Sequence, residues 1–440
     1  MAQRVDTAIV MLWGSEIGAV SWDDTRELGI FQYTPEFATS GIEVAPLTMP
    51  LSEQAYSFPA LPRETFKRLP GLLADVLPDK FGNALIDSWL ARKGISKAEF
   101  SPVDRLCYIG QRGMGALEFK PSVDRNAANH DHPLNIDALV TAASNILQRR
   151  EALHGELQEN EPDVNEKTLA DILHVGSSAG GARAKAVIAW NPENNEVRSG
   201  QILLPPGFEH WLLKFDGVSN NRDKELADGQ GYGKMEYAYY RMALAAGIEM
   251  TECRLLKENK RAHFMTRRFD RTRQGQKLHM QSLCAMEHFD FNMPGAYSYE
   301  QAMITAQKLN LGATAVEQIF KRALFNIMAR NQDDHVKNIA FLMDTTGQWK
   351  LAPAFDLTFS YNPEGEFTQL HQMSFNGKRD AFELSDFYAV AAQFGITTRK
   401  ARSAIEQVEQ GVKLWPKYAQ EADVEEQRIA FRQRQHRLNF

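Results

Sequence analysis

Apolar residues near the start of the chain recur first at the spacing of strands and then at that of helices. Residues 7–13 and 18–22 flank a turn and have the composition of strands, which predicts two paired strands. Residues 61–66 and 77–93 place apolar side chains at helical spacing, and Pro78 suits the first turn of the longer helix. The pattern predicts a small mixed unit at this end of the chain.

A glycine-rich segment and a polar segment follow. Residues 110–115 contain three glycines and lead into a strand pattern rather than a helix, so we interpret them as a structural hairpin and not as a phosphate loop. Residues 122–133 are rich in Asp, Asn, His and Pro, a composition typical of a linker. Beyond this linker, residues 135–157 and 166–174 predict helices.

The rest of the chain predicts strands first and helices later. Its first part predicts strands at 186–190, 209–215, 252–257 and 262–269, with a helix at 235–246. Its second part predicts two helices within 299–328, strands at 339–343 and 349–351, and helices at 384–394 and 400–419. We therefore expect an α+β fold with domains at residues 1–125, 126–270 and 271–440.

Composition limits the class of protein. The chain has 440 residues, of which 43% are hydrophobic, which is enough to bury a large core. No run approaches the roughly 18 apolar residues of a membrane span, and the first residues lack the order of a signal peptide. The three cysteines, Cys107, Cys253 and Cys284, are far apart, which argues against a disulfide framework or a cysteine-rich zinc site. We expect a cytoplasmic protein with no membrane partner.

The net charge of −6 gives no general attraction to nucleic acid, so any DNA contact needs a local patch or a partner. Residues 428–437 contain four arginines and no acid. We interpret this tail as a solvated segment.

The densest group of polar side chains lies at residues 331–338, where seven of eight residues are polar. A helix-to-strand connection needs only a few polar groups, although Asp333 or Asp334 would also suit such a connection by bonding local backbone amides. Asp333 and Asn338 have the five-residue separation of the Asp and Asn of a protein-kinase catalytic loop. The intervening strand pair would bring Asp356 back beside Asn338.

These residue types suit phosphoryl transfer. The reaction needs one carboxylate that orients the attacking hydroxyl, and Mg²⁺ needs oxygen ligands from an amide and a separate Asp. We therefore predict Asp333 as the general base, Asn338 and Asp356 as Mg²⁺ ligands, and ATP as the phosphate donor.

Further elements of a nucleotide site precede this group. Residues 176–185 form a compact Gly/Ser/Ala loop that would let backbone amides approach phosphates, although taken alone a plain tight turn explains such a run better. Lys214 shares a strand face with Leu212, and an inward lysine is uncommon unless it is paired. It would hold the α- and β-phosphates with Glu236 as its partner; the alternative is an edge position with the ammonium in solvent.

Residues 266–269 suit the hinge that supplies backbone hydrogen bonds to adenine. This assigns Arg268 and Phe269 to the nucleotide.

These elements occur in the order found in a protein kinase, and the sequence resembles the HipA family, the serine/threonine-kinase toxins of bacterial type II toxin–antitoxin pairs. The resemblance covers nearly the whole chain, and its most specific motif is Asp-x-His-x-Lys-Asn. The supporting segments are Leu77-Pro78-Asp79, Ile109-Gly110 with Gly115-Ala116, residues 177–185, Asp333-x-His335-x-Lys337-Asn338 and Phe355-Asp356.

The resemblance implies a small N-terminal α/β domain followed by a two-lobed protein-kinase-like core with a mostly helical C-terminal lobe. It implies that Asp333 is the base, that Lys214 contacts phosphate, and that His335 and Lys337 help to place the γ-phosphate. The nucleotide contacts that it implies in the loop are Ser178, Ala179, Gly180, Gly181 and Lys185.

The family autophosphorylates a loop serine, which expels the loop and stops ATP binding. The matching position is Ser177. This loop has an extra glycine, and Arg183 replaces the usual glutamine, so Ser178 is an equally accessible acceptor.

The resemblance also implies partners. These are a protein substrate, which in the family is an aminoacyl-tRNA synthetase, a HipB-like helix-turn-helix antitoxin, and DNA reached indirectly through that antitoxin. Two alternatives stay open, since the same catalytic groups serve a small-molecule kinase, and a catalytically idle corepressor would act only with its antitoxin.

Overall fold

The computed structural model describes residues 5–92, 94–96, 99–122, 139–144, 183–200, 204, 206–218, 222–223, 226–227, 231–258 and 260–440. The helix predicted at 166–174 and the glycine-rich loop at 176–182 lie outside these residues, as does most of the helix predicted at 135–157. The linker predicted at 122–133 also lies outside them, apart from its first residue.

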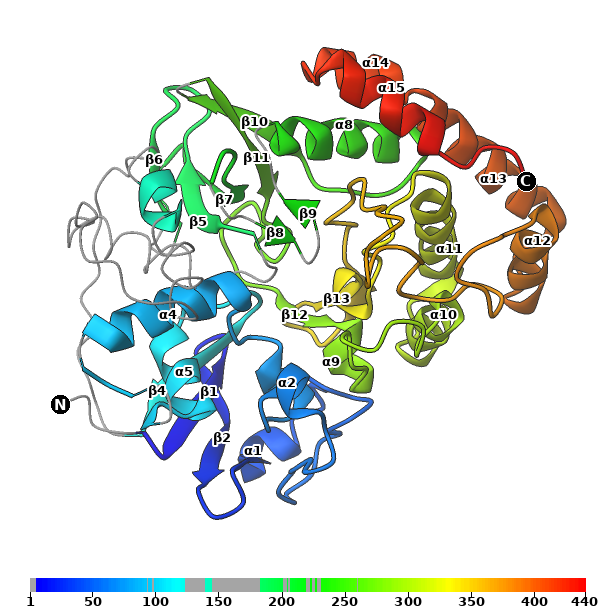
Figure 1. Ribbon diagram of the computed structural model, residues 1–440. Helices are drawn as coiled ribbons and strands as arrows, with labels where there is room; N and C mark the ends of the chain where they lie inside the picture. The colour runs from blue at the N-terminus through cyan, green and yellow to red at the C-terminus, as the bar shows by residue number, and fades with distance from the viewer. Residues whose placement is uncertain are drawn as a thin grey trace.

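The N-terminal unit contains a four-stranded antiparallel sheet in the order β3-β2-β1-β4 (Figure 1). Its strands are β1 (Thr7–Leu12), β2 (Ser15–Asp23), β3 (Leu28–Tyr33) and β4 (Leu117–Pro121). The paired strands β1 and β2 confirm the prediction from the sequence. Strand β3 was not predicted, and β4 pairs with β1 across more than 100 residues, so the prediction of a hairpin at residues 110–115 was wrong.

The N-terminal unit also contains the helices α1 (Pro35–Ala38), α2 (Arg63–Phe66), α3 (Gly71–Ala74), α4 (Lys80–Arg92) and α5 (Pro102–Ile109). Helix α4 begins at Lys80, so Pro78 precedes the helix and does not lie in its first turn as predicted. Helix α5 was missed, although Ser101 and Asp104 form a capping box at its start.

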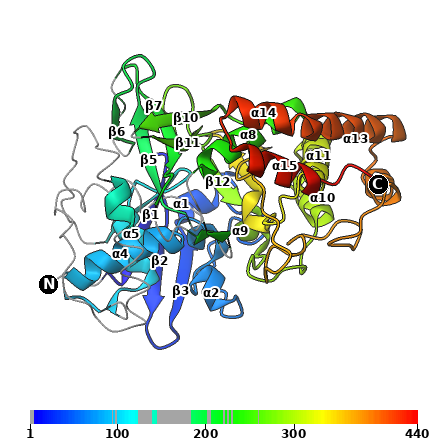
Figure 2. The same ribbon diagram turned by 45° about the horizontal axis from the view of Figure 1, so that its top comes forward.

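The second unit is a five-stranded sheet in the order β10-β11-β7-β5-β6 with helix α8 against it (Figure 2). Its elements are β5 (Lys185–Trp190), β6 (Val197–Ser199), β7 (Glu209–Lys214), α8 (Tyr232–Ala245), β10 (Cys253–Glu258) and β11 (Arg261–Arg267). A two-stranded ladder, β8 (Arg222–Asp223) with β9 (Leu226–Ala227), precedes α8. Phe81 and Leu85 of α4 share a buried core with Trp211 of β7, so the N-terminal unit packs directly on this sheet.

The third unit is mostly helical, as predicted. Its helices are α9 (Leu283–Glu287), α10 (Tyr299–Lys308), α11 (Gly312–Met328), α12 (Leu384–Gln393), α13 (Thr398–Lys413), α14 (Trp415–Glu421) and α15 (Glu426–Gln435). A three-stranded sheet, β12 (His279–Ser282), β13 (Ala340–Met343) and β14 (Trp349–Leu351), lies beside them. The β13–β14 pair confirms the predicted connection between residues 338 and 356.

The arginine-rich tail packs against the protein, so the prediction of a solvated segment was wrong. The Arg437 backbone donates to Met328 O at 2.9 Å, and the Arg432 guanidinium lies 5.0 Å from the centre of the Phe359 ring. Trp415 Nε1 donates to Ile429 O at 3.0 Å. Two hydrogen bonds and one cation–π contact therefore hold the tail on the helical unit.

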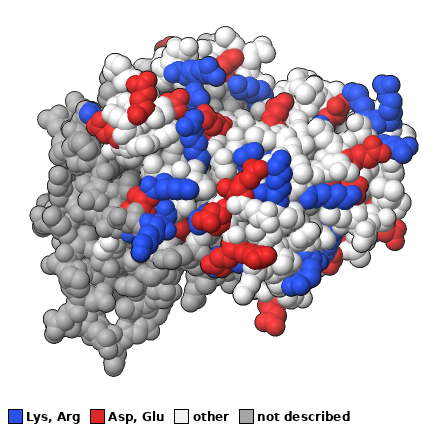
Figure 3. Space-filling model, turned by 90° about the horizontal axis from the view of Figure 1, so that it is seen from above, with Lys and Arg blue, Asp and Glu red and all other residues white. Residues whose placement is uncertain are grey.

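On the face seen in Figure 3, basic and acidic side chains are interspersed. Among the described residues, no helix has both the length and the apolar character needed to cross a lipid bilayer. The three cysteines carry no disulfide bond, as the sequence predicted.

Candidate active site

A cavity of about 1730 Å³ lies where the three units meet. Asp333, Asn338 and Asp356 all line it, together with Lys214 and Glu236. The five residues that sequence reasoning placed at one site therefore share one cavity, although they come from four separate segments of the chain.

The predicted catalytic loop follows α11, and its last residues form a single 3₁₀ turn, η2 (Val336–Asn338). Nδ2 of Asn338 donates to the backbone oxygen of Asp333 at 2.9 Å, and the His335 backbone donates to the same oxygen at 3.0 Å. These hydrogen bonds close the segment from Asp333 to Asn338 into a compact turn. The side chains of both residues line the cavity.

Lys214 is the electrostatic centre of the site. It lies at the end of β7, where Trp211 and Leu213 are buried in the opposite face of the strand. Its ammonium lies 2.5 Å from Glu236 Oε1 and also forms an ion pair with Asp356. This pairing confirms the inward orientation rather than the solvent-exposed alternative.

Charge complementarity favours the ionised forms of Asp356 and Lys214. Burial opposes ionisation of Asp356, but the nearby Lys214 ammonium holds the pKa of this carboxyl well below its ordinary value. Burial also opposes the charged form of Lys214, whereas Asp356 and Glu236 hold the pKa of the ammonium above its ordinary value. The site thus presents an ionised carboxylate and a cation next to each other.

Asp356 adopts a left-handed backbone conformation, with φ of 53°. Such a conformation is unfavourable for a non-glycine residue and concentrates at functional sites. The chain therefore changes direction after Phe355. The centre of the Phe355 ring lies 5.4 Å from the centre of the Phe269 ring.

The donor set fits Mg²⁺. This ion prefers oxygen ligands and, in nucleotide sites, takes one or two carboxylates or other protein oxygens while phosphates and water complete its coordination. Asn338 supplies an amide oxygen and Asp356 supplies an ionised carboxylate to the lining of the same cavity. The assignment of both residues to Mg²⁺ stays a prediction.

His335 and Lys337 lie beside one aromatic ring. The His335 ring centre lies 5.5 Å from that of Phe291, and Lys337 Nζ lies 4.8 Å from the same ring centre. All three residues line the cavity, which is compatible with the predicted placement of a γ-phosphate.

The loop residues are described only in part. Ser177, Ser178, Ala179, Gly180 and Gly181 lie outside the described residues. Lys185 is 2% exposed, and its ammonium lies 3.5 Å from Asp79 Oδ2 of the N-terminal unit. Its predicted nucleotide contact therefore competes with an ion pair to a carboxylate.

The predicted hinge lines the cavity, but part of it is already engaged. The backbone N–H of Arg268 donates to His210 O at 3.0 Å, and that of Arg267 donates to Glu252 O at 2.9 Å. The Arg268 guanidinium is buried against Asp270, with Nε to Oδ1 at 2.9 Å and Nη2 to Oδ2 at 2.6 Å. Backbone contacts to adenine at this place must come from other amides or from carbonyl oxygens, while Phe269 offers an apolar face.

Sequence reasoning missed several residues of the site. Arg183 lies 3.7 Å from Glu236, and its guanidinium carbon lies 3.2 Å from the Tyr232 ring centre. Asp79 and Gln372 were not predicted as site residues either. Asp79 belongs to the Leu77-Pro78-Asp79 motif, but nothing in the spacing of Gln372 distinguishes that residue.

Two protein-family models match this chain. The family model described as the HipA-like C-terminal domain matches residues 177–415, and the one described as the HipA N-terminal domain matches residues 8–120. No curated protein matches the chain.

Two solved structures are similar. The complex of HipA, HipB and operator DNA from the Shewanella oneidensis MR-1 toxin–antitoxin system has a chain with 18% identity and a TM-score of 0.66, covering 97% of this chain and 95% of that one. The Helicobacter pylori proinflammatory kinase CtkA has 11% identity and a TM-score of 0.30, covering 51% of this chain and 91% of its own, which is too distant to support an argument.

The first likeness shows the fold and confirms the predicted α+β class. The C-terminal family model alone spans more than half of the sequence. This chain therefore belongs to the HipA family.

Proposed function

We propose that this chain is a Mg²⁺- and ATP-dependent serine/threonine protein kinase that acts as the toxin of a HipA-type toxin–antitoxin pair. The observation that best supports the proposal is the ammonium of Lys214, which pairs with Glu236 and Asp356 in a cavity also lined by Asp333 and Asn338. A protein kinase needs the same five roles, namely a phosphate-holding lysine, its glutamate partner, a base and two metal ligands.

The chemistry follows from these positions. The acceptor hydroxyl oxygen attacks the γ-phosphorus of ATP, its bond to phosphorus forms, and the bond from the γ-phosphorus to the β,γ-bridging oxygen breaks to release ADP. Asp333 orients the hydroxyl and accepts its proton, a contribution of roughly 10²- to 10⁴-fold for a general base. Lys214 offsets phosphate charge, and Mg²⁺, when bound, supplies further neutralisation through Asn338 and Asp356.

We extend the proposal to regulation and partners. Autophosphorylation of Ser177 or Ser178 would act on the loop next to Arg183 and Lys185. The related chain from Shewanella oneidensis was solved with HipB and operator DNA. We infer a HipB-like antitoxin for this chain, with DNA reached through that antitoxin, a cytoplasmic location, and a protein substrate such as an aminoacyl-tRNA synthetase.

The test is phosphate transfer by the full chain and by Asp333→Asn. Wild-type protein incubated with Mg²⁺ and [γ-³²P]ATP should incorporate label, and Asp333→Asn should not. The control Asp344→Asn, at a half-buried turn residue that does not line the cavity, should behave as wild type. Addition of cell lysate separates a protein kinase, which labels protein bands, from a small-molecule kinase. Label retained by Asp333→Asn would remove Asp333 from the role of base.

A further inference from the structure

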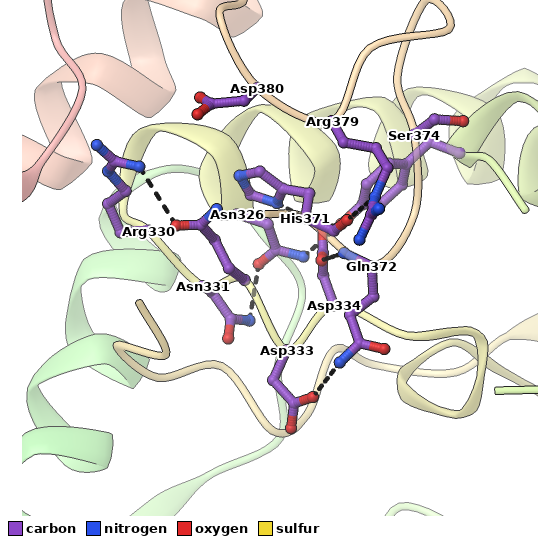
Figure 4. Close-up of polar contacts among 12 residues, drawn as sticks. Asn326, Arg330, Asn331, Asp333, Asp334, His371, Gln372, Ser374, Arg379 and Asp380 are labelled. Atoms are coloured by element: carbon purple, nitrogen blue, oxygen red, sulfur yellow. Dashed lines mark hydrogen bonds and ion pairs between the residues drawn. The ribbon is translucent and has the colours of Figure 1, made fainter. Parts of the chain in front are cut away.

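A buried carboxylate ties the catalytic loop to a coil segment beyond Asp356 (Figure 4). Asp334 is 1% exposed. Its Oδ1 accepts the backbone N–H of Gln372 at 2.8 Å, and its Oδ2 accepts the Tyr299 hydroxyl at 2.8 Å. Nδ1 of His371 lies 2.8 Å from the same Oδ2. Asp334 therefore fixes the segment around residue 372 by its backbone.

The backbone of Gln372 is held on both sides. Its N–H reaches Asp334, and its carbonyl oxygen accepts the Gly295 N–H at 2.7 Å. Gln372 as a whole is 3% exposed, and its Nε2 donates to Asp333 Oδ1 at 2.8 Å. A rigid backbone thus presents one amide N–H to the predicted base, from 39 residues further along the chain.

A contribution to the stability of the fold does not explain why position 372 holds a glutamine. Its Oε1 is buried and has no hydrogen-bond partner within the described part of the chain. An unpaired buried carbonyl destabilises a fold, and an apolar side chain of the same size would pack without that cost. The backbone contacts already anchor the segment, so the hydrogen bond to Asp333 is the distinctive contribution of this side chain.

We propose that Gln372 is the positioning residue of the base: its amide fixes the Asp333 carboxylate in the orientation that meets the acceptor hydroxyl. This inference rests on the proposed kinase function. An aspartate side chain rotates freely unless a partner holds it, and a reacting group displaced by about 1 Å can lose 10²-fold in rate. A hydrogen bond to Oδ1 sets the plane of the carboxylate and therefore the direction of Oδ2.

A loss of base positioning should lower the rate of phosphate transfer and leave the affinity for nucleotide unchanged. Asn338 is held by the Asp333 backbone oxygen, and Lys214 is held by Glu236 and Asp356. Removal of the Gln372 amide should therefore misorient the base while the Mg²⁺ and phosphate contacts persist. A collapse of the catalytic loop would instead move Asn338 and weaken nucleotide binding in parallel.

The decisive variant is Gln372→Met, which keeps the length of the side chain and removes the amide. Its control is Gln369→Met, an exposed position three residues earlier. With the full chain, we would measure the maximal rate constant of label incorporation from [γ-³²P]ATP, the ATP concentration at half-maximal rate, and the affinity for a non-hydrolysable Mg²⁺–ATP analogue. We expect Gln372→Met to lower the rate about ten- to a hundred-fold and to leave both nucleotide measurements within about twofold, while Gln369→Met matches wild type.

Other outcomes overturn the inference. A Gln372→Met rate within about twofold of wild type removes the role, and so does a parallel loss of rate and nucleotide affinity. If Gln372→Met does not fold, the isosteric Gln372→Glu variant decides by the same three measurements, because it replaces the donor with a carboxylate facing Asp333. If Asp333→Asn abolishes activity but Gln372→Met does not, this inference alone is contradicted. If the wild-type chain transfers no phosphate, the proposed function is contradicted as well.

Discussion

The carboxylate of Asp79 lies 3.5 Å from the ammonium of Lys185, and this buried ion pair joins the N-terminal unit to the five-stranded sheet. Burial raises the pKa of Asp79 to about 6, although Lys185 acts in the opposite direction. The attraction to Lys185 therefore does not fully offset the loss of hydration. Asp79 also lines the cavity, and carboxyl groups with a raised pKa in a cavity are common at functional sites.

This relationship predicts a pH-dependent effect of Asp79→Asn on stability. Because the folded-state pKa is raised, the folded protein binds the proton more tightly than the unfolded chain does, and wild-type stability is lost as the pH rises from about 4 to about 6. At about 1.4 kcal/mol per pKa unit, a rise from 3.8 to about 6 corresponds to on the order of 3 kcal/mol. Urea unfolding should show Asp79→Asn more stable than wild type at pH 7 and about equal at pH 4. An Asp79→Asn variant that is less stable at pH 7 would contradict this account.

The Lys214 ion pairs predict that Lys214→Met loses phosphate transfer. The substitution removes the cation that meets Glu236 and Asp356, and loss of one preorganised charge-stabilising group lowers rates by about 10²- to 10³-fold. The measurement is label incorporation from [γ-³²P]ATP. Lys234→Met is the matched control, because Lys234 pairs with the exposed Asp423 and should not affect transfer. Equal activity of the two variants would exclude Lys214 from the phosphate site.

The network around Asp270 predicts that the N-terminal unit supports the hinge. Asp270 is fully buried, accepts the Gly115 N–H at 2.7 Å, and pairs with the guanidinium groups of Arg268 and Arg271. Asp270→Asn should lower the free energy of unfolding by about 3–5 kcal/mol, because both guanidinium groups lose their counter-ion in a buried site. Urea denaturation measures this loss.

The pKa of the Asp270 carboxyl predicts the pH range in which Asp270→Asn lowers the free energy of unfolding. Burial opposes ionisation, but Arg268 and Arg271 hold the pKa of Asp270 well below its ordinary value of 3.8. The contribution of Asp270 is therefore complete above about pH 4 and declines as the pH falls further. The difference between Asp270→Asn and wild type should shrink in acid. Asp423→Asn, at an exposed ion pair, is the control and should unfold like wild type at every pH.

Autophosphorylation should be confined to the glycine-rich loop. Trypsin releases residues 168–183 as one peptide that contains both Ser177 and Ser178. Mass spectrometry of ATP-treated protein should find one added phosphate there, and the double variant Ser177→Ala/Ser178→Ala should incorporate none. The two single variants then assign the acceptor. Phosphate found only outside this peptide would contradict the predicted regulation.

The sequence by itself predicted most regular elements of the second and third units. Strand β14 and helix α12 lie at the predicted residues or within one of them, because apolar periodicity is a local property of the chain. Strand β3 and helix α5 were missed, although both contribute buried residues to the core. The Asp333–Asn338 spacing, the inward Lys214 and its partner Glu236 were also predicted from local patterns and the order of motifs.

Only the tertiary structure decided which distant groups meet. The spacing of residues along the chain does not predict the contacts of Asp79 with Lys185, of Asp270 with Gly115, or of Gln372 with Asp333. Each of these contacts joins segments that are far apart in the sequence. The folded surroundings also set the charge states of aspartate side chains: burial raises the pKa of Asp79, whereas at Asp356 the nearby Lys214 ammonium outweighs the effect of burial and lowers the pKa. The difference arises because the balance between lost hydration and nearby cations depends on the packed surroundings, which exist only in the folded chain.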